Sequence, residues 1–132
     1  MSDVGNHVTS LVPRVAFLPD SYYEVNGAAR TCRELTLFAR RRQYPFLLIH
    51  CGPDFRFSAE EPAWSLQLKR SRLSIPVDAD LRFDPTFYRQ RQLVEETVRR
   101  FRAGIIHITS PGDVGIIGAL TACKLHIPLV AS

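Results

Sequence analysis

The sequence has no long apolar run and few cysteines, and each absence narrows the class of protein. No stretch of its 132 residues approaches the roughly 20 consecutive apolar residues that a membrane-spanning helix requires. The three cysteines, Cys32, Cys51 and Cys123, are odd in number and lack the spacing of metal ligands. We therefore expect the cysteines to act as small, buried apolar side chains and not as zinc ligands. A reducing, cytoplasmic setting fits this expectation.

Common catalytic motifs are also missing. There is no Ser-x-x-Lys motif, no nucleophile elbow and no cysteine paired with a histidine. Gly112, Gly115 and Gly118 are spaced G-x-x-G-x-x-G, which differs from the G-x-G-x-x-G dinucleotide fingerprint and follows a late strand instead of the first. Gly115 and Gly118 are expected to be flat positions at which the last helix approaches its neighbours closely. The acidic loop at 76–85 lacks the glycine and terminal glutamate of a calcium loop. A Rossmann dehydrogenase and a calcium loop are therefore disfavoured.

The composition is that of one globular domain with a basic surface. Hydrophobic residues make up 45% and charged residues 23% of the chain, and 17 Lys and Arg against 13 Asp and Glu give a net charge of +4. This balance favours anionic partners such as nucleotides, phosphates and membrane surfaces. Arg40–Arg42 is one of the densest basic runs. It is either a solvated helix end or a docking patch for lipid headgroups, with nucleic acid the weakest alternative.

The hydrophobic pattern alternates between the strand and helix periods. Buried strands are predicted at 14–18, 46–51, 105–109 and 127–132, and helices at 28–42, 86–102 and 114–124. The apolar stripes of these helices are expected to include Phe38, Leu93 and Leu120, and Gly104 is expected to close the second helix. One or two short strands are expected within 66–75, near the sheet edge. This order predicts a Rossmann-like, three-layer αβα domain over 14–132 with a mainly parallel sheet, preceded by a flexible arm at 1–13.

In such a sheet, ligands bind outside the carboxyl ends of the strands. Asn26 and Gly27, just before a helix, could bring backbone N–H groups close to an anion, although a plain turn explains them equally well. Asp113 is interpreted as the cap of the last helix in preference to a catalytic base. His50 ends a strand and could face the crevice, but a structural role is favoured, and His107 is expected in the core.

Two stretches, 17–31 and 106–132, resemble retaining glycosyltransferases of family four. EVNGAART at 24–31 is similar to the family's P-E-V-N-G-V-x-R-T loop. SPGDVG at 110–115 and IPLVAS at 127–132 are similar to its H-I-x-x-P-x-D-x-G … I-P-L-V-A-S segment. RFDP at 82–85 also looks like a motif of one bacterial branch. The resemblance covers most of the chain.

The resemblance implies half of a GT-B enzyme: the amino-terminal, acceptor-side domain, without the carboxyl-terminal domain that holds most of the nucleotide-diphosphate sugar. It implies a donor-phosphate loop with Asn26, Gly27 and Arg30, and an acceptor cleft with Glu24, Ser110, Pro111, Gly112 and Asp113. The family's histidine and paired glutamates are not in these 132 residues, so no catalytic residue is assigned and the chain alone is expected to be inactive.

The family's reaction needs neither a metal nor an organic cofactor, and its partners are a nucleotide sugar, an acceptor and, in some settings, the cytoplasmic membrane surface. Two other functions remain open from the residues. One is a stand-alone α/β ligand-binding or regulatory module, and the other is a flavodoxin-like nucleotide binder with a different strand order.

Overall fold

The computed structural model describes residues 12–20, 22, 27–69, 75–76, 82–83 and 87–132. The six-stranded sheet consists of β1 (Val15–Leu18), β2 (Phe46–Gly52), β3 (Arg56–Glu60), β4 (Ala63–Lys69), β7 (Ile105–Ile108) and β8 (Leu129–Ala131). The helices are α2 (Gly27–Arg41), the 3-10 turn η1 (Phe87–Gln90), α3 (Arg91–Phe101) and α4 (Asp113–Leu125). A separate two-stranded ribbon pairs β5 (Ile75–Pro76) with β6 (Arg82–Phe83).

The strand order is β3-β4-β2-β1-β7-β8, and all neighbours are parallel except β3, which runs antiparallel to β4. If only the parallel strands are counted along the chain, the order is the 3-2-1-4-5 of a Rossmann sheet, whereas a flavodoxin-like sheet is ordered 2-1-3-4-5. The predicted Rossmann-like α/β fold is therefore confirmed, with β1 at its centre, and the flavodoxin-like alternative is wrong.

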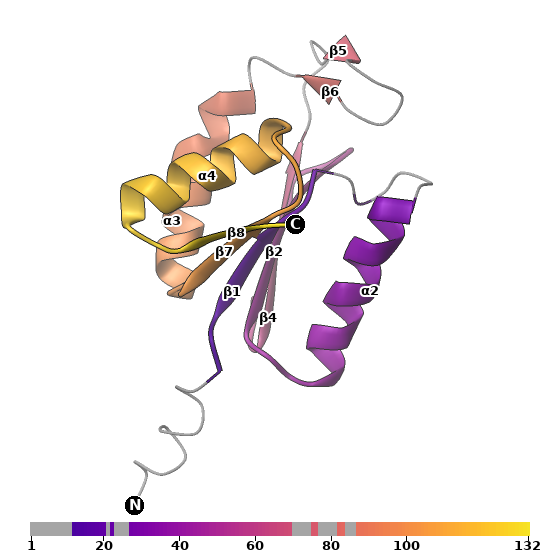
Figure 1. Cartoon of the computed structure of the whole chain (residues 1–132), viewed down its shortest axis with the longest axis vertical. Helices are drawn as coiled ribbons and strands as arrows, with labels where there is room; N and C mark the ends of the chain where they lie inside the picture. Colours follow the sequence, from indigo (N-terminus) through magenta and orange to yellow (C-terminus); the bar gives the residue numbers. More distant parts are fainter. Residues whose placement is uncertain (1–11, 21, 23–26, 70–74, 77–81, 84–86) are drawn as a thin grey trace, which may run out of the picture.

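Helices cover both faces of the sheet (Figure 1). Among the helices in the described residues, α2 lies alone on one face, and α3 and α4 pack side by side on the other. The chain moves from β1 to β2 in one direction along the sheet and from β7 to β8 in the opposite direction. Because both crossovers are right-handed, their helices must lie on opposite faces. The reversal places a topological switch point between β1 and β7.

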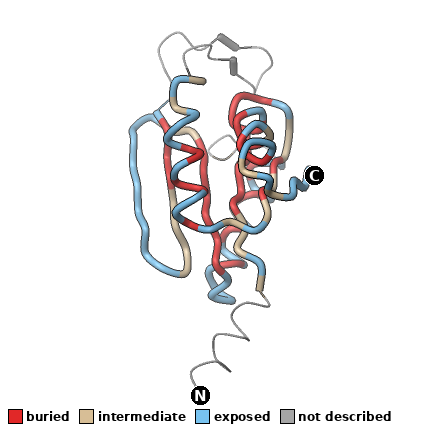
Figure 2. The backbone as a smooth tube through the Cα atoms, turned by 90° about the vertical axis from the view of Figure 1, so that its left-hand side faces the viewer, coloured by how far each residue is buried: buried red, intermediate tan, exposed pale blue. Residues whose placement is uncertain are grey.

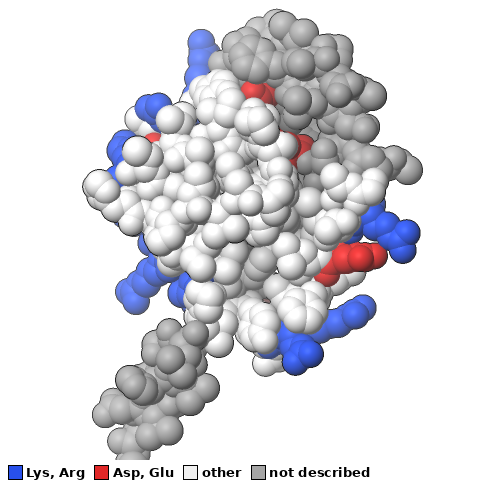
Figure 3. Space-filling model, viewed as in Figure 1, with Lys and Arg blue, Asp and Glu red and all other residues white. Residues whose placement is uncertain are grey.

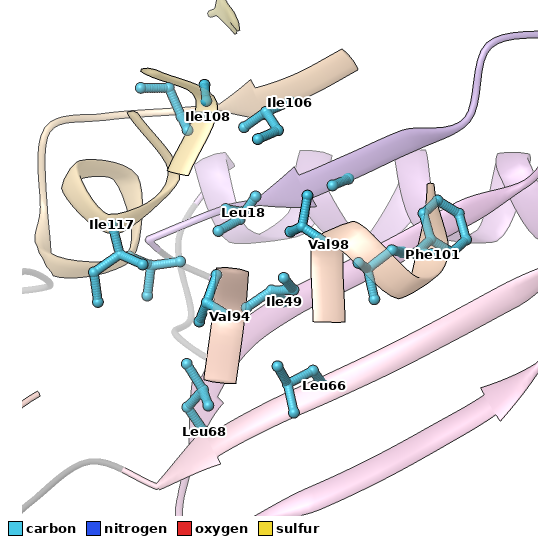
Figure 4. Packing of buried hydrophobic residues seen from close by; sticks show 14 residues of the cluster. Leu18, Ile49, Leu66, Leu68, Val94, Val98, Phe101, Ile106, Ile108 and Ile117 are labelled. Carbon is cyan, nitrogen blue, oxygen red and sulfur yellow. The ribbon is translucent and has the colours of Figure 1, made fainter. Parts of the chain in front are cut away.

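The larger core lies between the sheet and the α3–α4 layer (Figure 4). Leu18, Ile49 and Ile106 point from the strands toward Val98 and Ile117 of the helices, and each of these side chains is at most 1% exposed. Burying one such side chain stabilises the fold by about 1.5–3 kcal/mol. A smaller cluster under α2 contains Phe17, Cys32, Ala39, Phe46 and Leu48. Figure 2 shows the buried segments in the middle of the molecule.

The two sheet edges are more exposed than the sequence predicts. The segment at 127–132 was expected to be a buried strand, but Leu129 and Val130 are each 45% exposed. Strand β7 alternates between intermediate and buried residues instead of being buried on both faces. Helix α2 packs mainly over β2, so the α2 face of β7 and β8, which includes Val130, is partly uncovered within the described residues. Leu129 lies on the other face, in register with buried Ile106, and is exposed because β8 is the edge strand. Strand β3 was not predicted at all, because every residue in it is exposed and gives no apolar alternation.

Several side-chain predictions on the helices also need correction. Phe38, Leu93 and Leu120 were placed on buried stripes but are 48%, 39% and 43% exposed. Cys123 is exposed, although Cys32 is buried as expected. These positions lie at the margins of the apolar stripes, where a small change in helix rotation moves a side chain from the core to the surface. Arg102, and not Gly104, takes the left-handed conformation that ends α3.

Candidate functional site

The candidate site lies at the carboxyl ends of β1 and β7, where the strand order reverses. Leu18 of β1 is paired with Ile108 of β7, so the segments that follow these two residues leave the sheet side by side. Pro19 and Asp20 follow β1, and the loop 109–112 follows β7 and leads into α4. Two segments separated by about 90 residues in the chain therefore meet at the place where ligands bind in open α/β sheets.

The Asp20 carboxylate connects these two segments. Its Oδ2 accepts hydrogen bonds from Ser110 Oγ at 2.8 Å and from the backbone N–H of Gly112 at 3.1 Å. Its Oδ1 accepts from the N–H groups of Val114 and Gly115 at 2.9 and 3.2 Å. The Asp20 backbone N–H donates to Thr109 Oγ1 at 3.3 Å. A buried carboxylate from one strand thus caps the helix that follows its neighbour.

Burial and hydrogen bonding act on Asp20 in opposite directions. The residue is 8% exposed, and this burial raises the pKa of its carboxyl group above the usual 3.8, whereas the bonds from Ser110, Gly115, Gly112 and Val114 lower it. Burial is the larger effect. With two acceptor atoms each taking two hydrogen bonds, the carboxylate has little capacity left for a ligand. Asp20 therefore fixes the loop and leaves ligand contacts to its neighbours.

Gly115 makes this close approach possible. A Cβ at this position would overlap the carbonyl oxygen of Ser110 and lie 2.8 Å from Asp20 Oδ2. One turn later, a Cβ at Gly118 would lie 2.8 Å from Ile108 Cγ2. These two glycines let α4 pack directly against β1 and β7, as their spacing predicted.

Asp113 does not cap α4, so that prediction is wrong. The capping position is occupied by Gly112, and Asp113 is the first helical residue. Because the Asp20 carboxylate already bonds the first N–H groups of the helix, the Asp113 side chain serves another contact. The Tyr88 hydroxyl donates to its Oδ1 at 3.5 Å, and Asp113 is only 2% exposed. Burial, and then the Asp113 charge, raise the pKa of Tyr88 above 10.

The start of α2 forms the other side of the candidate site. Helices α2 and α4 both begin at the carboxyl edge of the sheet, on opposite faces (Figure 1). Gly27 is the first residue of α2, is exposed, and has open space where a Cβ would be. No acidic residue lies in the first turn. Arg30 is exposed one turn on and forms an ion pair with Glu34 at 3.1 Å.

His50 lies at the end of β2, beside this helix start. Its ring is 3% exposed and packs against the Tyr22 ring, with centroids 4.6 Å apart. Burial lowers the pKa of His50 to about 4, and the contact of its Nδ1 with the Cys51 carbonyl, at 3.4 Å, opposes this only weakly. The ring is therefore neutral at physiological pH, and the predicted structural role is consistent with its burial.

The structure brings some of the predicted site residues together. Ser110, Gly112 and Asp113 form one rigid loop, with Pro111 exposed at its tip. Gly27 and Arg30 lie on α2, while Asn26 and Glu24 fall outside the described residues, as does most of the acidic loop at 76–85. His107 is half-buried, not in the core, and its Nε2 lies 2.8 Å from Ser132 Oγ.

Sequence reasoning missed Asp20 and Tyr88. Asp20 had a usable signal, because a carboxylate directly after the central strand of a parallel sheet lies at the ligand-binding edge. Tyr88 had none, since its contact with Asp113 depends on how η1 packs against α4.

Metal binding and membrane insertion find no support in the part of the chain that the structure describes. It contains no group of three or more His, Cys, Asp or Glu side chains placed to hold a metal ion. Its helices are all too short or too polar to cross a membrane. Comparison with protein-family models finds none that matches the chain, and comparison with curated proteins finds no significant match.

Proposed function

We propose that this chain is the acceptor-side domain of a retaining glycosyltransferase with the GT-B architecture. The whole enzyme would transfer a sugar from a nucleotide-diphosphate donor to an acceptor hydroxyl in the cytoplasm. The proposal rests on the resemblance of residues 17–31 and 106–132 to family four. The Rossmann-like fold is compatible with it.

One observation carries the proposal: the family-like segments converge at the switch point. The chain from β1 into α2 includes the first segment, and the loop after β7 includes the second. Asp20 joins them through hydrogen bonds to Ser110 and Gly112. Pro111 and its neighbours thereby form a fixed wall, which is what an enzyme needs to position an acceptor hydroxyl for reaction.

The helix starts suggest where the donor diphosphate binds. The N-terminus of α4 is already occupied by the Asp20 carboxylate, so a phosphate would meet like charge there. The N-terminus of α2 has no acidic side chain in its first turn and has open space at Gly27. Backbone N–H groups at such a helix start, assisted by Arg30, would stabilise the leaving diphosphate without a metal.

The second candidate is a stand-alone binding or regulatory module that keeps the fold without catalysis. The four hydrogen bonds to Asp20 fix the loop whether or not a reaction takes place there, so they are compatible with this candidate as well. The two functions differ in product formation, so one assay separates them.

The test is glycosyl transfer by the protein translated from its whole reading frame, with a panel of nucleotide sugars. Gly27→Val should lower turnover by about a hundredfold, because the side chain fills the space that the diphosphate approaches. The fold should persist, since nothing lies within 4 Å of a Cβ there. Gly104→Val is the matched control, because Gly104 lies at the opposite sheet edge and a Cβ there would be 3.9 Å from its nearest neighbour. If Gly27→Val leaves transfer unchanged, Gly27 is not part of the site. If the native protein shows no transfer with any donor, the binding module is favoured.

A further inference from the structure

The amino edge of the sheet, opposite the candidate site, gathers arginines from distant parts of the chain. Helices α2 and α3 run antiparallel to the strands that follow them, so both end at this edge, where their last turns are basic. Arg14 lies between them: its Nε donates to the Phe101 carbonyl at 2.7 Å. Figure 3 shows Lys and Arg atoms at the lower left and lower right of the molecule. We name this surface the basic edge; it consists of Arg14, Arg40, Arg41, Arg42, Arg99, Arg100 and Arg102.

The positive charge of the basic edge is only partly neutralised by the protein. Acidic residues near it in the described chain include Glu60 and Glu61, at the β3–β4 turn, and Glu96, which precedes Arg100 by one turn of α3. Glu61 already bonds Arg14 at 3.0 Å and the Trp64 indole at 3.2 Å. The arginines at the ends of α2 and α3 are exposed and form no ion pair within the described residues. They are free to bind an external anion.

Apolar side chains lie next to these arginines. Leu37 and Phe38 are each 48% exposed, and Tyr44 is 39% exposed. Phe38 and Tyr44 border a cavity of about 420 Å³, whose other walls include Leu35 and Pro45. Its lining is apolar apart from the Tyr44 hydroxyl and His107. A cationic rim around exposed apolar side chains is the composition of a surface that lies in the headgroup region of a bilayer.

The ring geometry favours lipid over nucleic acid. A nucleic-acid platform offers open aromatic faces on which bases stack. Here the Arg42 guanidinium lies over the Phe38 ring, 5.4 Å from its centroid. The Tyr44 ring meets Phe38 edge to face, with centroids 6.2 Å apart. One face of Phe38 is therefore covered, while its exposed side and the cavity can accept hydrocarbon.

We propose that the basic edge docks onto an anionic lipid bilayer. The arginines bind headgroup phosphates, Leu37, Phe38 and Tyr44 enter the headgroup–acyl boundary, and the cavity receives part of an acyl chain. A second hollow of about 340 Å³, lined by Arg14, Arg100 and Arg102 together with Glu61 and Phe101, lies on the same surface. Docking in this orientation leaves the carboxyl edge, with the candidate site, facing away from the bilayer. The inference does not depend on the proposed function.

Vesicle cosedimentation tests the docking. The native chain should bind phosphatidylglycerol–phosphatidylcholine vesicles, bind pure phosphatidylcholine weakly, and dissociate as salt is raised. The combined change Arg40→Gln, Arg41→Gln, Arg42→Gln should weaken binding by about a hundredfold, since each arginine near an anionic surface contributes about fivefold. The control variant removes the same charge at the carboxyl edge and combines Arg56→Gln, Lys69→Gln and Arg89→Gln, whose side chains are all exposed. It should lower binding much less.

A second pair of variants tests the apolar contact. Leu37→Ser with Phe38→Ser should lower binding to anionic vesicles, and circular dichroism should show an unchanged fold because both side chains are exposed. The control variant combines Ile116→Ser with Leu120→Ser, at two exposed positions of α4. It should bind like the native chain. Equal binding by the two charge variants would overturn the proposal. So would binding to duplex RNA or DNA that is tighter than binding to vesicles and indifferent to Leu37 and Phe38.

Discussion

The Asp20 side chain accepts four hydrogen bonds at the candidate site. It bonds Ser110, Gly112, Val114 and Gly115 across the gap between β1 and α4. Three of these donors are backbone N–H groups at a buried helix start. A backbone N–H group left unpaired in such a place costs about 1–3 kcal/mol. One side chain after the central strand therefore determines the conformation of the whole loop.

Asp20→Ala should lower the free energy of unfolding by about 2–4 kcal/mol, because it removes the cap and leaves these N–H groups buried without partners. Urea unfolding at neutral pH measures the change. Asp54→Ala, at an exposed position, is the control and should change stability by less than about 0.5 kcal/mol. Equal stability of the Asp20 and Asp54 variants would show that water replaces the carboxylate at no cost.

His50 should make stability depend on pH. Its pKa is about 4 in the folded chain and 6.5 as the ordinary value. Between these values the unfolded chain binds the proton and the folded chain does not, so its contribution is complete above pH 6.5 and is lost as pH falls toward 4. The loss between about pH 7 and about pH 4.5 amounts to about 2–3 kcal/mol.

The measurement compares urea unfolding at these two pH values for the native chain and His50→Asn. On acidification, the variant should lose about 2–3 kcal/mol less of its free energy of unfolding than the native chain loses. His126→Asn is the matched control, because His126 is exposed and its left-handed backbone also suits asparagine. An unchanged pH dependence in His50→Asn would contradict the buried, neutral ring.

At the scale of elements, two helices begin at the same sheet edge under opposite constraints. Helix α4 packs so closely that Gly115 and Gly118 have no room for a side chain, whereas Gly27 at the start of α2 has open space. The first pair is needed for packing. Packing does not require a glycine at position 27, so ligand approach is the function to test at Gly27.

Gly115→Ala should therefore destabilise the fold by more than about 3 kcal/mol, because its Cβ overlaps the Ser110 carbonyl and helix and strand must separate. Gly27→Ala should keep or raise stability by up to about 1 kcal/mol, since alanine favours the helix. Thermal unfolding of the two variants gives the comparison. A fully stable Gly115→Ala chain would show that α4 can move away from β7 easily.

At the scale of the whole molecule, the two edges of the sheet differ in protection. Edge strand β3 carries Arg56 and Glu60, and charges on an edge oppose pairing with another chain. Edge strand β8 has the sequence LVA, and its Leu129 and Val130 are each 45% exposed. Unpaired backbone groups beside exposed apolar side chains form a surface on which chains associate.

We expect the 132-residue chain to self-associate through β8 at high concentration. Val130→Lys should shift the population toward monomer in sedimentation velocity, because a charge on the edge must be desolvated when strands pair. Ala59→Lys on exposed β3 is the control and should leave the association unchanged. Monomeric native chain at all concentrations would refute the expectation.

The sequence by itself determined the α/β class, the parallel sheet and the approximate bounds of its main helices. The spacing of apolar residues depends on which side of a helix or strand is buried, so it can be recognised within one element. The apolar runs at 14–18 and 46–51 accordingly coincide closely with β1 and β2. The sequence also identified Gly115 and Gly118 as close-packing positions. It failed for β3, because a strand exposed along its whole length has no buried face to produce a pattern.

Only the tertiary structure decided which carboxylate caps α4 and which faces stay uncovered. Asp113 is adjacent to the helix start in sequence, but Asp20 reaches it from a neighbouring strand because β1 and β7 are paired in register. Likewise, Val130 is apolar but exposed, because no described helix covers that face. Contacts between residues far apart in the chain depend on strand order and helix placement, and these are set by packing the whole molecule instead of by any local pattern.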